Sequence, residues 1–214
     1  EQHRYMPKGS SPRPGPWRCD PYQREILDAC SDPSVREVTC LKSTQVGWSE
    51  ILNCVLLYFI AADPRPAMLV LPTIEDAKGY GKKRLTPAIE HCAPARQLVR
   101  KATSRRAGNT LTLKEFPGGF LKLTGANSGT GLRSDPVGLL VRDEADAYPE
   151  DVDGEGDPLE ISRRRTDQYP DALNLDGGTP AKPRGLSPVE ASYLSSSRGR
   201  FHVSCPHCGE LQPL

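Results

Sequence analysis

The chain has 214 residues, enough for one domain of α/β size or for one and a half smaller domains. Its 28 basic and 27 acidic side chains give a net charge of +1, so overall charge neither indicates nor excludes a polyanionic partner. Seven irregularly spaced cysteines are not typical of a secreted disulfide framework, and we expect reduced thiols in a cytosolic protein. The longest apolar run, residues 51–62, falls short of the roughly 20 residues that span a bilayer. It predicts a buried helix and no membrane association.

The composition changes twice along the chain. Residues 1–19 are rich in proline and glycine, and we expect an extended arm that buries little surface. Residues 20–185 carry the hydrophobic patterns of one domain, and residues 186–214 are interpreted as a linker and the start of a cysteine-containing segment. Because the chain begins at Glu1 rather than methionine, we expect it to be part of a longer protein.

The predicted elements begin with a helix after Asp20, which suits an N-cap, with Pro21 in the first helical position. A β-rich run at residues 36–41 leads into a loop, and a long apolar helix follows from about Trp48. The later elements are an interrupted helical stretch at 73–92, a helix at 158–166, strands at 67–72, 136–146 and 171–180, and a hairpin formed by 110–116 and 118–126. Strands that alternate with helices predict an α/β fold with a mostly parallel sheet flanked by helices.

The loop after the first long strand, LKSTQVGWSE at residues 41–50, is similar to a phosphate-binding loop that lacks its lysine. The common pattern is G-x-x-x-x-G-K-[ST] at a strand-to-helix junction, and this loop lies at such a junction. Trp48 stands at the lysine position, and we expect Lys42 to reach the phosphates from the opposite rim. The alternative is a solvated lysine beside a site that has lost its function. The candidate binding residues are Lys42, Ser43, Thr44, Gln45, Val46, Gly47, Trp48 and Ser49.

Two acids complete the candidate site. The apolar run LLVRDEAD delivers Asp143 and Glu144 at the carboxyl end of a predicted strand, which is the edge of the sheet where the loop also lies. Phosphoryl transfer needs one carboxylate that holds Mg²⁺ with the Ser49 hydroxyl and one that orients the attacking water. We assign these roles to Asp143 and Glu144. The alternative is a helix-capping acid beside a solvated neighbour.

These residues resemble the N-terminal ATPase domain of the large terminase subunits of tailed bacteriophages, in particular the lambda-like group. The matching motifs occur in order: DPYQREILDA, LKSTQVGWSE, LTGANSGTGLRS, LLVRDEAD, GGTP and CPHCGE. Terminase motors also carry a basic residue early in the loop and a residue other than lysine at the usual lysine position. The resemblance implies a P-loop NTPase fold of the RecA/ASCE type, with ATP and Mg²⁺ as ligands.

The resemblance also implies a function and partners. The protein would be an ATP-driven motor that moves double-stranded DNA into a procapsid in the cytoplasm of the host cell. Its partners would be the small terminase subunit, the portal of the procapsid and further copies of itself in a ring. Large terminases of this type carry a nuclease domain, which would follow the present C-terminus, so we expect no nuclease activity from these residues.

Three further site residues follow from the resemblance. Gln23 would lie near adenine, with a surface glutamine as the alternative, and Thr179 in GGTP would sense the γ-phosphate, with an ordinary tight turn as the alternative. Arg133 in GLRSDP is the candidate for the arginine that meets developing phosphate charge. Arg142 or an arginine of a neighbouring subunit remains an alternative to Arg133.

Two other patterns concern metal and DNA. Cys205 and Cys208 have the spacing of half a zinc site, so Zn²⁺ is a possible ligand of the longer protein. Basic residues that suit contacts to a DNA backbone, or an ordinary solvated surface, are Arg96, Arg100, Lys101, Arg105 and Arg106, and then Arg163, Arg164 and Arg165.

Two rival functions remain open. The run Asp143-Glu144-Ala145-Asp146 spells the acidic motif of a group of helicases, but those enzymes carry a lysine late in the phosphate loop and a second motor domain. The other rival is a degenerate nucleotide fold that serves only as a scaffold or DNA clamp. Trp48 in the lysine position favours that scaffold, and Glu144 argues against it.

Overall fold

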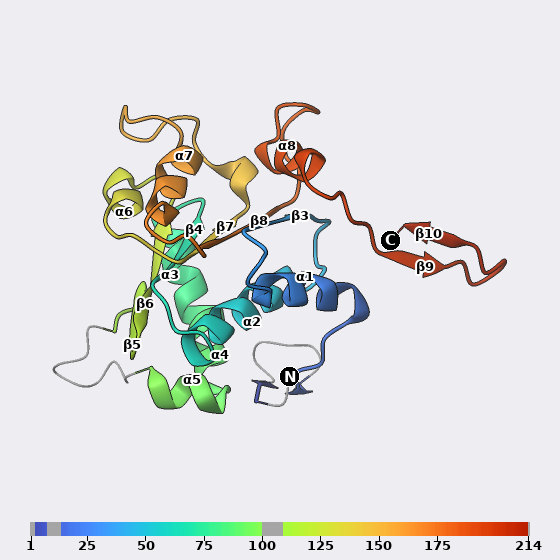
Figure 1. Cartoon of the computed structure of the whole chain (residues 1–214), viewed down its shortest axis with the longest axis horizontal. Coiled ribbons are helices and arrows are strands. Elements are labelled where there is room, and N and C mark those ends of the chain that lie inside the picture. The colour runs from blue at the N-terminus through green and yellow to red at the C-terminus, as the bar shows by residue number, and fades with distance from the viewer. Residues whose placement is uncertain (1–2, 8–13, 100–108, 214) are drawn as a thin grey trace.

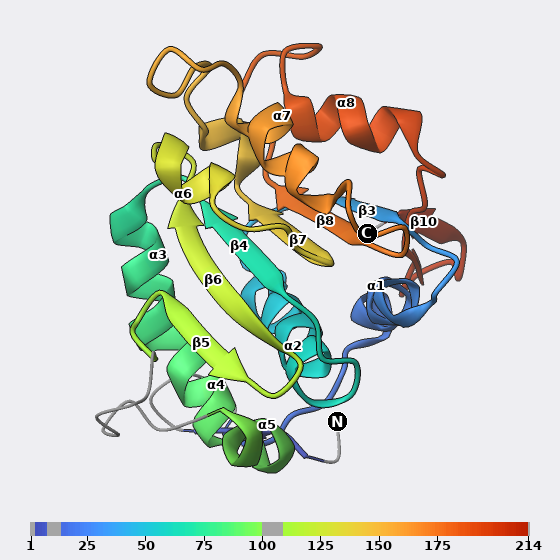
Figure 2. The ribbon, with the colours of Figure 1, turned by 60° about the vertical axis from the view of Figure 1, so that its left-hand side comes forward.

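The computed structural model describes residues 3–7, 14–99 and 109–213. Its centre is a six-stranded sheet in the order β3-β8-β7-β4-β6-β5. The strands are β3 (Glu37–Leu41), β4 (Ala67–Leu71), β5 (Leu113–Phe116), β6 (Gly119–Gly125), β7 (Leu139–Asp143) and β8 (Leu173–Gly178). All neighbouring strands run parallel except the β5–β6 hairpin, so the predicted mostly parallel sheet with one hairpin is confirmed. Figures 1 and 2 show β3 at one edge and β5 at the other.

Helices cover both faces of the sheet (Figure 2). On one face lie α2 (Trp48–Ala61), α3 (Ile74–Tyr80), a π-helical turn (Gly81–Leu85), α4 (Thr86–Glu90) and α5 (Ala93–Leu98), with α1 (Pro21–Ser31) beside α2. On the other lie α6 (Gly129–Arg133), α7 (Pro158–Arg163), α8 (Pro188–Ser195) and short 3-10 turns at Ala145–Ala147 and Arg164–Thr166.

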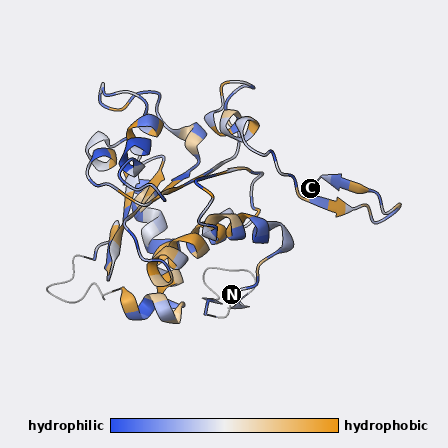
Figure 3. Ribbon diagram, in the orientation of Figure 1, coloured by the Kyte–Doolittle hydropathy of each residue, from blue (hydrophilic) through white to orange (hydrophobic). Residues whose placement is uncertain are grey.

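The two apolar cores follow from the alternation of side chains along the buried strands. In β4, Leu69 packs into the core on the α2 face, whereas Met68 and Val70 pack into the core on the opposite face. β4 and β7 are buried along their whole length, as expected of parallel strands covered on both faces. Figure 3 shows the apolar residues concentrated in α2 and the central strands. In the part of the chain that the structure describes, no helix is both long and apolar enough to cross a membrane.

The N-terminal segment differs from the expected arm. Its described residues include β1 (Tyr5–Met6), which pairs with β2 (Gly15–Pro16). Met6 and Trp17 are buried, and the Arg4 side chain lies against α2, where it pairs with Glu50. The expectation that this segment buries little surface is therefore wrong for these residues. Contacts with residues distant in the sequence bury side chains that the proline- and glycine-rich composition does not predict to be buried.

The C-terminal segment also differs in part from the expected linker. Helix α8 packs against β3, with the Thr39 and Ser192 hydroxyl oxygens 2.7 Å apart, and Val189 is buried in the core. Residues within 186–214 therefore contribute a helix to the main domain. The final hairpin, β9 (His202–Ser204) and β10 (Leu211–Pro213), projects away from the sheet (Figure 1).

Candidate functional site

The carboxyl ends of three parallel strands meet at one edge of the sheet. β3 ends at Leu41, β7 at Asp143 and β8 at Gly178, and β8 lies between the other two. A pocket of about 310 Å³ opens at this edge. Its lining residues are Lys42, Ser43, Thr44, Gln45, Gly47, Trp48, Ser49, Glu50, Arg84, Asp143, Glu144 and Thr179. The structure thus brings together most of the residues that the sequence singled out.

The loop conformation depends on Gly47. Its φ of +70° is left-handed, and a Cβ there would lie 2.7 Å from Gln23 Nε2, so only glycine fits without a shift. Helix α2 begins directly afterwards at Trp48. The N–H groups of its first turn have no intrahelical acceptor, and with the helix dipole they favour an anion in the pocket.

Trp48 has a structural task at the lysine position. Its indole Nε1 donates a hydrogen bond to Asp143 Oδ1 at 2.8 Å, and both side chains are buried. The indole lies on Gly177, where a Cβ would come within 2.0 Å of the ring. Trp48 therefore fixes Asp143 at the end of β7. This role of Trp48 was not predicted from the sequence, although the glycine pair at 177–178 was a signal that a large side chain approaches β8.

Lys42 reaches across the pocket to the second acid. Lys42 Nζ lies 2.6 Å from Glu144 Oε1, and the lysine side chain is only 10% exposed. The alternative of a solvated lysine is therefore wrong. Glu144 adopts a left-handed φ of +53°, and its other oxygen accepts a hydrogen bond from the N–H of Thr179 at 3.3 Å. The relocated cation, the acid and the GGTP segment form one connected group.

Asp143 is the buried acid of the pair. Burial raises the pKa of Asp143 to about 6, although the hydrogen bond from Trp48 works in the opposite direction. The neighbouring Glu144 charge raises this pKa further, and Lys42 lowers it. Asp143 and Ser49 both line the pocket, and their carboxylate and hydroxyl oxygens are the ligand types that Mg²⁺ prefers.

Gln23 contacts the loop at Val46. Gln23 Nε2 lies 3.5 Å from the Val46 carbonyl oxygen, and Gln23 Oε1 accepts from the N–H of Asp20 at 3.1 Å. The Tyr22 hydroxyl donates to the same Val46 carbonyl at 3.1 Å. Gln23 is only 3% exposed, so the alternative of a surface glutamine is wrong. Its expected place near adenine stays a prediction.

The structure places the expected arginines elsewhere. Arg133 pairs with Glu155 at 2.8 Å and does not line the pocket. Arg142 is buried and makes two hydrogen bonds of 2.6 Å to Asp176, so the alternative that it meets the phosphates is wrong. Arg84 lines the pocket instead. Arg84 was not predicted from the sequence, although this residue ends a basic run that interrupts a predicted helix.

Asp146, the last residue of the acidic run after β7, joins two segments of the chain. Its Oδ1 accepts from the Ser187 hydroxyl at 2.8 Å, and its Oδ2 accepts from the N–H of Ala181 at 2.8 Å. Asp146 therefore ties the end of β7 to the chain between β8 and α8.

Other expected residues lie away from the pocket. Cys205 and Cys208 lie in the segment between the two strands of the terminal hairpin, and within the described residues no group of three or more His, Cys, Asp or Glu is arranged to hold a metal. Zinc binding there stays a prediction. Arg163 pairs with Glu37, and Arg165 donates to the Arg133 carbonyl at 2.8 Å. Arg96 lies in α5, and the other members of the first basic cluster, Arg100, Lys101, Arg105 and Arg106, lie outside the described residues.

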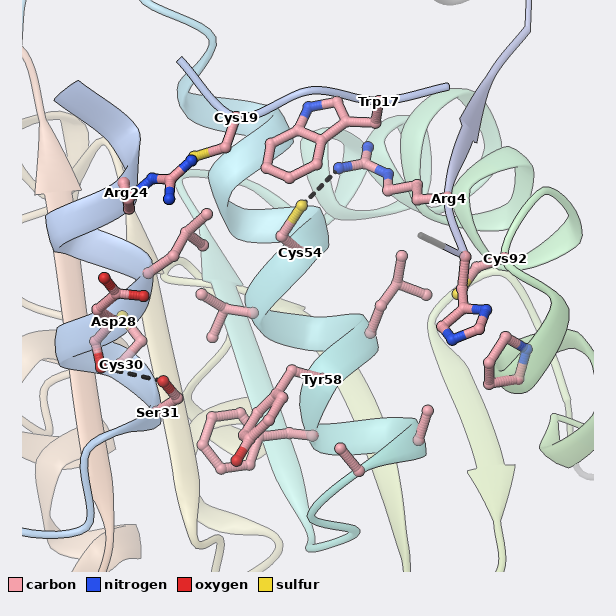
Figure 4. A pocket seen from close by; sticks show the side chains of 18 residues that line it. Arg4, Trp17, Cys19, Arg24, Asp28, Cys30, Ser31, Cys54, Tyr58 and Cys92 are labelled. Carbon is pink, nitrogen blue, oxygen red and sulfur yellow. Dashed lines mark hydrogen bonds between the residues drawn. The ribbon is translucent and has the colours of Figure 1, made fainter. Parts of the chain in front are cut away.

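A larger pocket, of about 620 Å³, lies between α1, α2 and the N-terminal segment (Figure 4). Its wall is mainly apolar and includes Cys19, Cys30, Cys54 and Cys92. Arg4 reaches across it and donates to Cys54 Sγ at 2.8 Å. This wall contains neither the phosphate loop nor the paired acids, so it is separate from the candidate site.

The comparison with known proteins decides the family. Residues 11–214 match the family model of the phage terminase large subunit gpA, ATPase domain. The chain is 35% identical to the large terminase subunit of Escherichia phage lambda over 98% of its own length. The chain belongs to the gpA terminase family. It is an ATPase domain, and the resemblance inferred from its motifs is confirmed.

Solved structures support the fold of this terminase domain. The crystal structure of the HK97 bacteriophage large terminase has a TM-score of 0.64 at 14% identity and covers 84% of this chain and 36% of that chain. The Thermus phage P74-26 large terminase ATPase domain has a TM-score of 0.59 at 20% identity and covers 92% of this chain and 78% of that chain. This terminase domain spans about a third of the length of the curated relatives it matches.

Proposed function

We propose that this chain is the motor domain of a large terminase subunit, and that it hydrolyses ATP to translocate double-stranded DNA into procapsids. The observation that carries the proposal is the pair of Lys42 and Glu144 across the pocket, with the phosphate loop on one side and Thr179 on the other. A scaffold would not need a cation and an acid held in contact at a helix N-terminus. The family match argues against the helicase alternative.

The phosphates of ATP are bound by Lys42 and by the N–H groups around Gly47. Asp143 and Ser49 would hold Mg²⁺, which when bound neutralises charge on the phosphates. Phosphate competes with Glu144 for Lys42, and Glu144, once free of the lysine, orients the attacking water. Because Glu144 also accepts from Thr179, a change in the Glu144 position is passed to the GGTP segment. That link is our candidate for the coupling of hydrolysis to movement.

The partners and setting follow from the same proposal. The parent protein would act with the small terminase subunit and the portal of a procapsid, as a ring of identical subunits in the host cytoplasm. A nuclease domain elsewhere in the parent would cut the DNA. The Cys205–Cys208 pair would bind Zn²⁺ only with ligands from other residues.

The test uses the full-length subunit with its small subunit, procapsids and linear DNA. We expect ATP-dependent protection of DNA from added nuclease, and DNA-stimulated ATP hydrolysis, with Glu144→Gln abolishing both. Lys78→Ala, an exposed change on α3, is the control and keeps both activities. DNA protection that persists in Glu144→Gln would contradict the motor, and strand separation without procapsids would favour a helicase.

A further inference from the structure

Arg84 adds a second cation to the wall of the pocket. It lines the pocket together with Ser49 and Glu50, and its side chain is exposed there. The nearby acids form ion pairs with residues other than Arg84: Glu50 pairs with Arg4, and Glu144 pairs with Lys42. Among the residues that the structure describes, Arg84 makes no ion pair or hydrogen bond. Its charge is therefore available to an anion in the pocket.

Contacts of Tyr80, one helical turn before Arg84, fix the position of Arg84. Tyr80, at the end of α3, is buried, and its hydroxyl oxygen lies 3.0 Å from Asn53 Oδ1 and 3.3 Å from the Ser49 carbonyl oxygen. These contacts attach the end of α3 to the first two turns of α2. Gly81, which opens the π-helical turn, lies so close to Leu111 that a Cβ would be 2.2 Å from the Leu111 carbonyl oxygen. The π-helical turn that carries Arg84 is thus held in place beside α2.

Arg84 lies near the start of α2 on the side of Ser49. Tyr22 and Gln23 contact the loop on a different side. Tyr22 and Gln23 contact the loop at Val46, on the side where α1 packs against α2. Tyr80 and the π-helical turn approach through Ser49 and Asn53. If the base lies toward Gln23, then the terminal phosphate lies toward Ser49 and Arg84.

We propose that Arg84 contacts the terminal phosphate of ATP and stabilises the negative charge that develops on it during hydrolysis. The inference rests on ATP hydrolysis at this pocket. In that reaction the water oxygen bonds to the γ-phosphorus and one water proton passes by way of Glu144 to the phosphate product. The bond between the γ-phosphorus and the β–γ bridging oxygen breaks, and ADP leaves with the electron pair. Arg84 keeps its proton throughout and acts by charge and hydrogen bonding.

The experiment compares wild type, Arg84→Ala and Arg84→Lys in the full-length subunit, with Lys82→Ala as the matched control. Lys82 is exposed on the same π-helical turn but does not line the pocket. Steady-state kcat and KM for Mg·ATP are measured, together with the affinities for ADP and for a non-hydrolysable ATP analogue. Thermal unfolding of each variant checks the fold.

We expect Arg84→Ala to lower kcat by about 100-fold or more, since arginines that meet transferring phosphoryl groups contribute on the order of 10³ to 10⁵ in rate. Affinity for the ATP analogue falls while ADP affinity is unchanged, and Arg84→Lys recovers part of the rate. The inference is overturned if Arg84→Ala behaves like Lys82→Ala, or if ADP and analogue binding weaken equally. A wild type that fails to bind and hydrolyse ATP would overturn the proposed function as well.

Discussion

At the scale of single residues, the hydrogen bond from Trp48 to Asp143 joins the first turn of α2 to the end of β7. Lysine at this position would bring a flexible charge into a site where an indole now fills the space over Gly177. The basic residue of the loop is instead Lys42, which directly follows β3, and β8 lies between β3 and β7. Trp48 therefore positions the acid, and our proposal leaves phosphate binding to Lys42.

We predict that Trp48→Phe lowers the free energy of unfolding by about 1–3 kcal/mol, because Asp143 stays buried without its indole donor. Urea unfolding measures this change, and ATP turnover should fall with it because Asp143 is less firmly held. Trp17→Phe is the control for the loss of a buried indole: Trp17 lies beside Arg4 and lines the larger pocket rather than the candidate site, so its replacement should lower turnover less than Trp48→Phe does. Equal turnover in wild type and Trp48→Phe would contradict the positioning role.

At the scale of elements, Asp146 connects β7 to the segment that leads into α8. Burial opposes ionisation of Asp146, but hydrogen bonds from the Ala181 N–H, the Ser187 hydroxyl and the N–H groups of Val189 and Lys182 outweigh it and lower its pKa below the ordinary 3.8. A carboxyl whose pKa is lowered by folding stabilises the fold above its unfolded pKa, and this stabilisation is lost as the pH falls through the folded pKa.

We therefore predict that Asp146→Asn lowers the free energy of unfolding by about 2 kcal/mol at neutral pH, because the amide offers only one acceptor to donors that now bond both carboxylate oxygens. The difference between wild type and variant should shrink as the pH falls below about 4. Urea titrations from pH 7 downward measure it. A difference that stays constant across this range would show that the charge of Asp146 does not contribute.

At the scale of the whole molecule, the N-terminal segment is attached to α2 through the pair of Arg4 and Glu50. The Arg4 guanidinium lies over the Trp17 ring, 5.4 Å from its centroid, and donates to both the carboxylate and the carbonyl oxygen of Glu50. Glu50 in turn lines the pocket of the candidate site. A segment far from the acids along the sequence thus supports the wall of the site.

We predict that Arg4→Met lowers the free energy of unfolding by about 3–5 kcal/mol, because removal of one partner leaves a largely buried carboxylate unpaired. The double variant Arg4→Met, Glu50→Gln should recover much of this loss, since no unpaired charge then remains. Chemical unfolding of the four proteins in this cycle measures the coupling. Additive effects of the two substitutions would mean that the pair contributes little.

The sequence predicted the elements with strong local patterns and missed those that depend on distant contacts. β4 and β7 are apolar runs and α2 follows a loop pattern, so their places could be inferred, as could the meeting of Lys42, Asp143 and Glu144 at one edge of the sheet. The burial of Arg4 depends on Glu50, and the role of Trp48 depends on Gly177. Neither contact can be predicted from a local sequence pattern. Arg84 reaches the pocket only because Tyr80 fixes its helix to α2.

The central claim is that Lys42 supplies the phosphate-binding cation and Glu144 the catalytic carboxylate. The most direct test measures Mg·ATP affinity and single-turnover hydrolysis for wild type, Lys42→Ala, Glu144→Gln and the exposed control Lys78→Ala, with and without double-stranded DNA. We predict that Lys42→Ala weakens binding by roughly 10- to 100-fold, since a hydrogen bond to a charged group contributes about 1.5–3 kcal/mol. Glu144→Gln should bind ATP but not hydrolyse it. Binding by Lys42→Ala that equals wild type, or turnover by Glu144→Gln that equals the control, would contradict the account.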